Sequence, residues 1–237
     1  GVNDNAVYLI TSEKEIPAKA FSNEELNYIK KEIKAKHKQI EINRYTSTCY
    51  CILLDKENDY KVAENARIAA YNLTSTLNTA KIKAISIVSE LAVTAAFIEG
   101  IGLSNYQFLK YFSEKKLNPL KTVKVIGSIK KIALNEVINT VEGTNYAKDL
   151  VNEPQSFLTA TEIAKAIKRL GKEAGFKVEV FNKSKIKALK MGGLLAVNKG
   201  SIEPPTFSIL EWKPKNAKNK KPIILVGKGV VYDTGGL

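Results

Sequence analysis

Strand-like apolar runs alternate with helix-like segments along the first part of the chain, and this alternation constrains the fold more than any other feature. Short apolar runs at residues 6–11, 49–54 and 84–89 are each followed by a segment whose apolar residues recur at helical spacing. A further strand is expected at 122–127. Because repeated strand–helix–strand units build a parallel sheet with helices on its faces, the sequence predicts an α/β fold with a mostly parallel sheet.

The helices of this part have recognisable start signals. Ser22 and Glu25 have the spacing of a capping box, and Ser89 is expected to cap the helix that follows the third strand. The helices expected here cover residues 22–38, 64–77, 89–101 and 132–151.

A second α/β series follows Pro154, since a proline ends a helix at or before the preceding residue. Its first helix is expected to be capped by Thr159 or Thr161. The expected elements are helices at 159–175 and 184–191, and strands at 177–181, 192–201, 207–212 and 222–227. The resulting domain prediction is a small N-terminal α/β domain at 1–131, a linking helix at 132–151, and the incomplete start of a second α/β domain at 152–237.

Composition narrows the class of protein. With 237 residues, 44% of them hydrophobic, the chain can bury one large core or two modest ones. The most apolar window, 84–103, is interrupted by Glu90 and Glu99, so no membrane span and no membrane partner are expected. Cys49 and Cys51 lie two apart in one strand and share a face, so we expect free thiols and a cytoplasmic protein.

The charge of the chain is strongly basic and unevenly distributed. The net charge is +13, and residues 151–237 carry +9 of it, from 16 basic and 7 acidic side chains. Arginines number three, at positions 44, 67 and 169, and the remaining basic residues are lysines. Since arginine reads phosphates and guanines with its planar fork, this surface favours solvation over nucleic-acid recognition.

Catalysis by histidine or cysteine is not expected. The single histidine, His37, lies among lysines on the charged face of a helix and is expected to be solvated. A catalytic triad, a Cys–His dyad and a histidine-ligated zinc site all need a protected histidine. Any chemistry would therefore depend on carboxylates and lysines.

Lys228 and Asp233 are the candidates for such chemistry. Each follows an apolar stretch, and buried charges are costly unless they are paired or bind a metal. One interpretation is a metal site that takes both groups; the other is a β-hairpin in which they are exposed or form a salt bridge. In the metal-site interpretation, Thr234, Gly235 and Gly236 would give the tight backbone turn that lets another strand or a ligand come close.

Three stretches, in order, resemble motifs of the leucine (cytosol) aminopeptidase family. They are YAKDLVNEPQSFLT, MGGLLAVNKGSIEPP and LVGKGVVYDTGGL, and EGIGLSNYQFLKYFS resembles a weaker pattern of the family. The resemblance runs from about residue 90 to Leu237. Lys148 stands where the family usually has arginine, and Tyr232 where it usually has phenylalanine.

The resemblance implies a function. It makes Lys228 and Asp233 ligands of two divalent metal ions, zinc or else manganese or magnesium, in a metal-dependent aminopeptidase that releases N-terminal amino acids, leucine-type, from peptides. It implies a homohexamer in the cytoplasm. The catalytic residues and the other ligands are expected downstream of Leu237, so the chain is expected to be a truncated piece, inactive and poorly stable.

Two alternatives remain open at this level. One is a binding or regulatory protein that has the aminopeptidase scaffold without catalysis. The other is a nucleic-acid-binding role, which the lysine-rich second part would suit.

Overall fold

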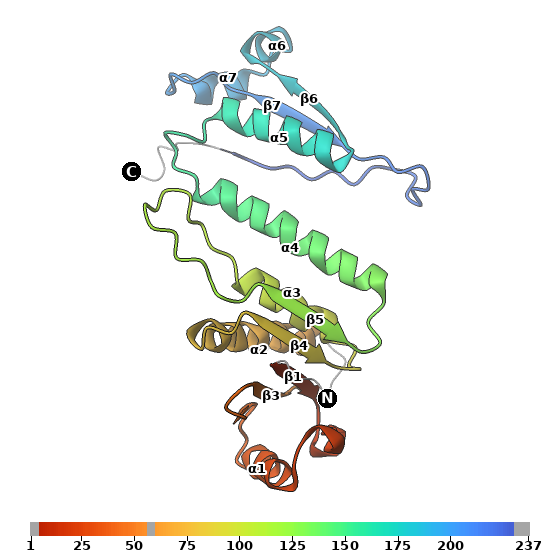
Figure 1. Ribbon diagram of the computed structural model, residues 1–237. Coiled ribbons are helices and arrows are strands. Elements are labelled where there is room, and N and C mark those ends of the chain that lie inside the picture. The colour runs from red at the N-terminus through yellow and green to blue at the C-terminus, as the bar shows by residue number, and fades with distance from the viewer. Residues whose placement is uncertain (1–4, 56–59, 230–237) are drawn as a thin grey trace. The chain divides into compact units, whose positions relative to one another are not determined.

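The computed structural model describes residues 5–55 and 60–229 of the chain. The chain divides into two compact units, Gly1–Asp149 (unit 1) and Leu150–Leu237 (unit 2). Each unit has its own sheet (Figure 1). Within the described ranges, no helix is both long enough and apolar enough to cross a membrane.

Unit 1 is built on a five-stranded sheet in the order β2-β3-β1-β4-β5. The pairs β1–β3, β1–β4 and β4–β5 are parallel, and β2 is antiparallel to β3. The α/β prediction with a mostly parallel sheet is confirmed, although the edge strand β2 was not expected. The strands are β1 (Ala6–Ile10), β2 (Gln39–Asn43), β3 (Thr48–Leu53), β4 (Ala84–Val88) and β5 (Thr122–Ile126).

The helices of unit 1 follow the predicted order. Ser22 and Glu25 form the predicted capping box, in which the Glu25 N–H donates to Ser22 Oγ at 3.2 Å and the Ser22 N–H donates to the Glu25 carboxylate at 2.8 Å. The helices are α1 (Asn23–Lys34), α2 (Tyr60–Thr79), α3 (Thr94–Ser104) and α4 (Lys131–Asn152), with short 3-10 turns η1 (Glu13–Glu15) and η2 (Ala18–Ala20).

The predicted cap at Ser89 is wrong. Helix α3 begins at Thr94, and its N-cap position is Val93, which has no capping side chain. Ser89 Oγ instead accepts a hydrogen bond from the Leu91 N–H at 3.1 Å and lies 2.6 Å from Thr94 Oγ1. The Ser89 hydroxyl therefore makes its hydrogen bonds within the turn between β4 and α3, before the first residue of the helix.

The sheet of unit 1 is covered on both faces. All five residues of β1 are buried. Val7 and Leu9 pack into a cluster with residues of α2 and α3, whereas Tyr8 and Ile10 pack into a second cluster with Ile29 of α1. The period of two along the strand therefore divides its side chains between two cores.

Both cysteines lie on the α1 side of the sheet, as predicted from their spacing. Cys49 and Cys51 are free and buried in the same cluster. Burial raises the pKa of the Cys51 thiol to about 12 and also raises the pKa of Cys49. Both side chains therefore behave as small apolar groups of the core.

Arg44 ties the edge strand β2 to α1. Its Nε and Nη2 donate to the two carboxylate oxygens of Glu25, each at 2.7 Å, and Nη2 also donates to the Ala20 carbonyl at 2.7 Å. The Arg44 hydrogen bond lowers the pKa of Glu25. A bidentate pair of this kind fixes the orientation of both partners, so the capping box and the edge strand share one carboxylate.

Helices α2 and α3 cross at a glycine. A Cβ atom at Gly100 would lie 2.7 Å from the Cα and carbonyl oxygen of Arg67, which is too close for any side chain. Next to the crossing, the Arg67 guanidinium donates to a carboxylate oxygen of Glu99 at 3.0 Å. The close approach of the two backbones thus requires glycine at this position.

The described residues of unit 2 form a two-stranded antiparallel sheet with three helices. Thr159 is the cap of its first helix, as one of the two predicted candidates, and Gly175 ends it in the left-handed conformation. A Cβ at Gly171 would lie 2.4 Å from Val178 Cγ2, so this helix packs closely on the sheet. The elements are α5 (Ala160–Ala174), β6 (Lys177–Phe181), α6 (Lys183–Ala188), α7 (Gly192–Asn198) and β7 (Phe207–Glu211).

Two strand predictions in unit 2 are wrong. Residues 192–201 form helix α7 and the turn after it, since a short apolar run that begins with glycines fits either kind of element. Residues 222–227 are extended but belong to neither sheet. A strand needs a neighbour for its backbone groups, and none of the described residues pairs with this segment.

We expect opposite effects from alanine at two helical glycines. Gly100→Ala should lower the free energy of unfolding of unit 1 by about 1–3 kcal/mol, because the backbone of Arg67 must move. Gly143→Ala on α4, where nothing lies within 4 Å of the added Cβ, should raise helix stability by up to about 1 kcal/mol. Urea unfolding of both variants measures this, and equal effects would contradict the close crossing.

Tyr50→Phe should stabilise unit 1 at pH 7 by about 1 kcal/mol, because the buried Tyr50 hydroxyl has no hydrogen-bond partner. Burial raises the pKa of Tyr50 from 10.0 to about 12. Stability from this raised pKa is present below pH 10 and is lost as the pH rises towards 12.

Between pH 10 and pH 12, the free energy of unfolding measured in urea should therefore fall less for Tyr50→Phe than for the wild type. The Cys51 thiol titrates in both proteins and so does not cause this difference. Tyr28→Phe, at an exposed tyrosine, is the matched control and should change neither quantity. Equal alkaline slopes for Tyr50→Phe and wild type would contradict the prediction.

Candidate metal site

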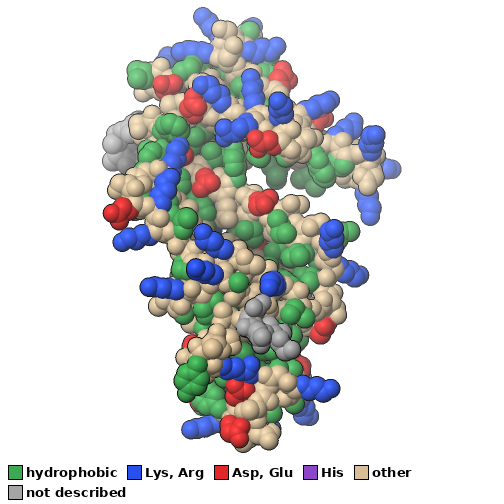
Figure 2. Space-filling view, in the orientation of Figure 1, with side chains coloured by type: hydrophobic (Ala, Val, Ile, Leu, Met, Phe, Trp, Pro, Cys, Tyr) green, Lys and Arg blue, Asp and Glu red, His purple; other side chains and the backbone are tan. Residues whose placement is uncertain are grey.

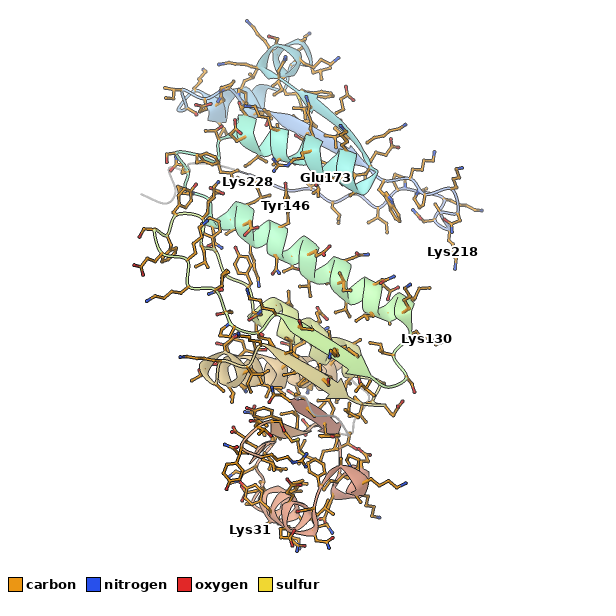
Figure 3. The ribbon with its side chains drawn as sticks, in the orientation of Figure 1. Lys31, Lys130, Tyr146, Glu173, Lys218 and Lys228 are labelled. Carbon is orange, nitrogen blue, oxygen red and sulfur yellow. The ribbon has the colours of Figure 1, made fainter. Side chains whose placement is uncertain are left out.

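Lys228, one of the two predicted ligands, lies in residues 222–229, the last described segment of unit 2. It is exposed and belongs to no helix or strand (Figure 3). The apolar residues that precede it are also exposed. Their exposed fractions are 83% for Ile223, 76% for Ile224, 91% for Leu225 and 92% for Val226. Lys228 is thus not held in a protected site by the described residues.

Asp233, the other predicted ligand, lies outside the described residues. Within 5–55 and 60–229 there is no group of three or more histidine, cysteine, aspartate or glutamate side chains that could hold a metal ion. One lysine amine alone does not fit a pair of divalent ions, which takes several nitrogen and oxygen ligands. The ligand roles of Lys228 and Asp233 remain predictions, as does the hairpin alternative.

His37 is a surface residue, as predicted. Its side chain is 61% exposed, and its Nδ1 lies 2.6 Å from a carboxylate oxygen of Glu32 on α1. This surface contact joins the imidazole to a carboxylate and contains no nucleophile for the imidazole to activate.

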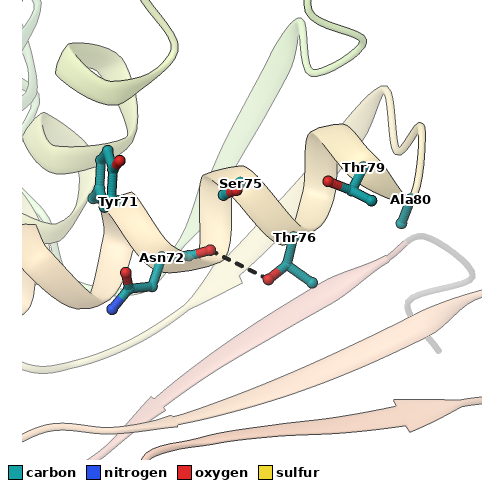
Figure 4. A pocket seen from close by; sticks show the side chains of 6 residues that line it. All are labelled: Tyr71, Asn72, Ser75, Thr76, Thr79 and Ala80. Atoms are coloured by element: carbon teal, nitrogen blue, oxygen red, sulfur yellow. Dashed lines mark hydrogen bonds between the residues drawn. The ribbon is translucent and has the colours of Figure 1, made fainter.

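A hollow of about 510 Å³ lies on the outer face of α2. It is lined by uncharged side chains (Figure 4). Thr76 Oγ1 donates to the Asn72 carbonyl at 3.2 Å, so part of the lining is satisfied within the helix. The lining residues are Tyr71, Asn72, Ser75, Thr76, Thr79 and Ala80, which include no carboxylate, histidine, lysine or cysteine.

Two groups of lysines lie at opposite ends of the small sheet of unit 2, on α6 and in the loop at 213–221, while others lie on α5. Helix α6 follows the last residue of β6, whereas the loop at 213–221 follows β7, whose last residue Glu211 pairs with the first residue of β6, Lys177. Lys218 lies in that loop (Figure 3), and Figure 2 shows Lys and Arg side chains spread over the visible face. The antiparallel register therefore separates the two basic groups instead of joining them in one groove.

Sequence reasoning did not anticipate that two of the motif-like segments contact each other. Tyr106, from the segment after α3, donates its hydroxyl proton to Asp149 Oδ1 at 2.8 Å. Lys148 Nζ lies 5.0 Å from the centre of the Tyr106 ring. A signal for this contact exists only in the tertiary structure, since the partners are more than 40 positions apart.

The second part of the chain matches the model of a known protein family. Residues 145–237 match the model described as "Cytosol aminopeptidase family, catalytic domain". A probable cytosol aminopeptidase of Chloroherpeton thalassium is 49% identical over 115 residues, which are 48% of this chain and 22% of that protein. A probable cytosol aminopeptidase of Aquifex aeolicus is 33% identical over 202 residues, 81% of this chain and 40% of that protein. The chain thus spans less than half the length of these relatives.

Solved structures match the fold over most of the chain. A tomato leucine aminopeptidase mutant has a TM-score of 0.78 and 17% identity, and the match covers 98% of this chain and 52% of that one. The bottromycin maturation enzyme BotP, in complex with Mn, has a TM-score of 0.69 and 22% identity over 91% of this chain and 46% of that one. At these identities the likeness shows the fold alone.

The amides of residues 222–229 should exchange with solvent at nearly the rate of an unstructured peptide, because the described residues give them no strand partner. The amides of β1, buried at the centre of unit 1, should be protected by at least about 1,000-fold relative to them. Hydrogen exchange of this chain followed by mass spectrometry measures both. Strong protection of 222–229 would show that the segment is paired.

Proposed function

Because this chain belongs to the cytosol aminopeptidase family, we propose that the whole protein removes amino acids, leucine-type, from the free N-terminus of peptides by metal-dependent hydrolysis. The observation that carries this proposal is the match of residues 145–237 to the catalytic domain. That region contains both Lys228 and Asp233. The chain spans less than half of the relatives described above, so the activity is proposed for the whole protein.

Lys228 and Asp233 are proposed as two of the ligands of a pair of divalent ions. Two bound ions would polarise the scissile carbonyl and generate a nucleophilic hydroxide from water at neutral pH. The Lys228 amine must lose its proton to bind an ion, and the Asp233 carboxylate would supply a negative oxygen ligand. Because these two groups do not suffice, the remaining ligands and the catalytic residues are proposed to lie outside this chain.

Several parts of the proposal rest on the family alone. The structure of BotP contains Mn, which supports a divalent ion and leaves zinc, manganese and magnesium as candidates here. Peptides as substrates, a cytoplasmic location and a homohexamer are proposed on the same basis. The division into a domain at 1–131, a linking helix at 132–151 and a catalytic domain from 152 also remains a proposal.

Hydrolysis of leucine p-nitroanilide by the longer protein that contains this chain tests the function. We expect activity that a chelator abolishes and that Zn²⁺ or Mn²⁺ restores. Lys228→Met and Asp233→Asn should each lower kcat/KM by about 100-fold or more, because loss of a metal ligand costs at least as much as loss of the groups that orient it.

Lys221→Met is the matched control, since it removes an exposed lysine seven positions before Lys228 and should leave kcat/KM unchanged. Metal content, measured by mass spectrometry of the purified variants, should fall for Lys228→Met and stay at the wild-type value for Lys221→Met. Full activity in the presence of chelator would contradict the proposal. Metal binding without hydrolysis of any N-terminal residue would instead favour a binding protein on the same scaffold.

A further inference from the structure

Helix α4 has few apolar contacts with the rest of unit 1. Val137 is the one buried residue of the helix. Ile132 and Val151, near its two ends, are 72% and 84% exposed. A helix with so little buried apolar surface depends on the contacts that its other side chains make.

The C-terminal end of α3 and the residues after it supply those contacts. A Cβ at Gly102 would lie 2.9 Å from both γ-carbons of Val141, so the two helices approach closely there. Seven residues after Val141 on α4, Lys148 Nζ donates to the Leu103 carbonyl at 3.0 Å and lies over the Tyr106 ring. The Tyr106 hydroxyl donates to Asp149.

Side-chain hydrogen bonds of Asn105 hold the backbone beside Tyr106 in place. Asn105 Nδ2 donates to the Leu120 carbonyl at 2.9 Å, and Asn105 Oδ1 accepts from the side-chain amides of Asn78 and Asn118 at 3.0 and 3.1 Å. Asn78 belongs to α2. The amide network therefore fixes the loop that carries Tyr106 to the core helix, so that Tyr106 is a pre-positioned partner for α4.

These contacts lie where the region matched to the catalytic domain begins and where unit 1 ends. The catalytic-domain match begins at residue 145, whereas unit 1 extends to Asp149. Lys148 and Asp149 therefore belong to the matched domain by sequence and to unit 1 by contact. The first residues of the matched region are thus held within unit 1.

We propose that Tyr106, Lys148 and Asp149 form a latch that keeps the last turns of α4, where the catalytic-domain match begins, folded on unit 1. The latch combines a charged hydrogen bond, a cation–π contact and a hydroxyl–carboxylate bond, and it joins α4 to the end of α3 and the segment after it. The latch goes beyond the proposed hydrolysis, and its test measures no activity.

Hydrogen exchange of the full chain tests the latch in three variants. Tyr106→Phe removes only the hydroxyl, and Lys148→Met removes the cation while keeping the aliphatic stem. In both, the amides of residues 143–152 should exchange at least about fivefold faster, the effect expected from losing one hydrogen bond to a charged group. Lys148→Arg keeps a cation and donors at the same position and should retain the wild-type rate.

Tyr71→Phe, at an exposed tyrosine of α2, is the matched control and should leave the exchange of 143–152 unchanged. The amides of α2 should keep their wild-type rates in Tyr106→Phe and Lys148→Met, which shows that these variants fold. Wild-type exchange of 143–152 in both variants would overturn the proposal. An equal acceleration in α2 and in 143–152 would also overturn it, because the effect would then be general destabilisation and not release of a local latch.

Discussion

The burial of β1 is the constraint on which unit 1 depends. This strand has parallel neighbours along both edges and a covered core on both faces. Each of its residues must therefore be apolar, and adjacent residues must suit different cores. The helices must therefore present apolar side chains to the sheet, since α1 covers one face while α2 and α3 cover the other. The close crossing at Gly100 follows, because two helices share one face of a sheet only five strands wide.

The elements that could be predicted from the sequence are those whose signal is local. The four parallel strands and the capping box at Ser22 depend on apolar runs and on spacings within one turn. The failures depend on distant partners. Strand β2 is an edge strand whose alternating residues follow a lysine-rich helix end, and its place is fixed by Arg44 contacting Glu25 across 19 positions. Residues 222–227 have the composition of a strand, but pairing is a property of two segments, and the second segment is absent from the described residues.

For the candidate site, too, the local signals could be predicted from the sequence, whereas the contacts between distant segments could not. Lys228 and Asp233 could be singled out because polar groups after apolar runs are unusual in one sequence, and the motif-like spacing made the choice specific. Their assembly into a site could not be derived, since a metal centre needs ligands from several elements. Unit 2 as described buries the apolar side chains of Ala164, Ala166 and Ile186. So small a core cannot by itself fix the strand that would present a ligand.

The buried cysteines give unit 1 a built-in reporter. Only the thiolate reacts readily with alkylating reagents, and both thiols have raised pKa values and no access to solvent in the folded state. Modification must therefore wait for an opening that separates the α1 layer from the sheet. Because the two cysteines of the chain lie on that one face, the rate of alkylation would time the opening of this layer. Two buried side chains of the core thus report the fluctuations of unit 1.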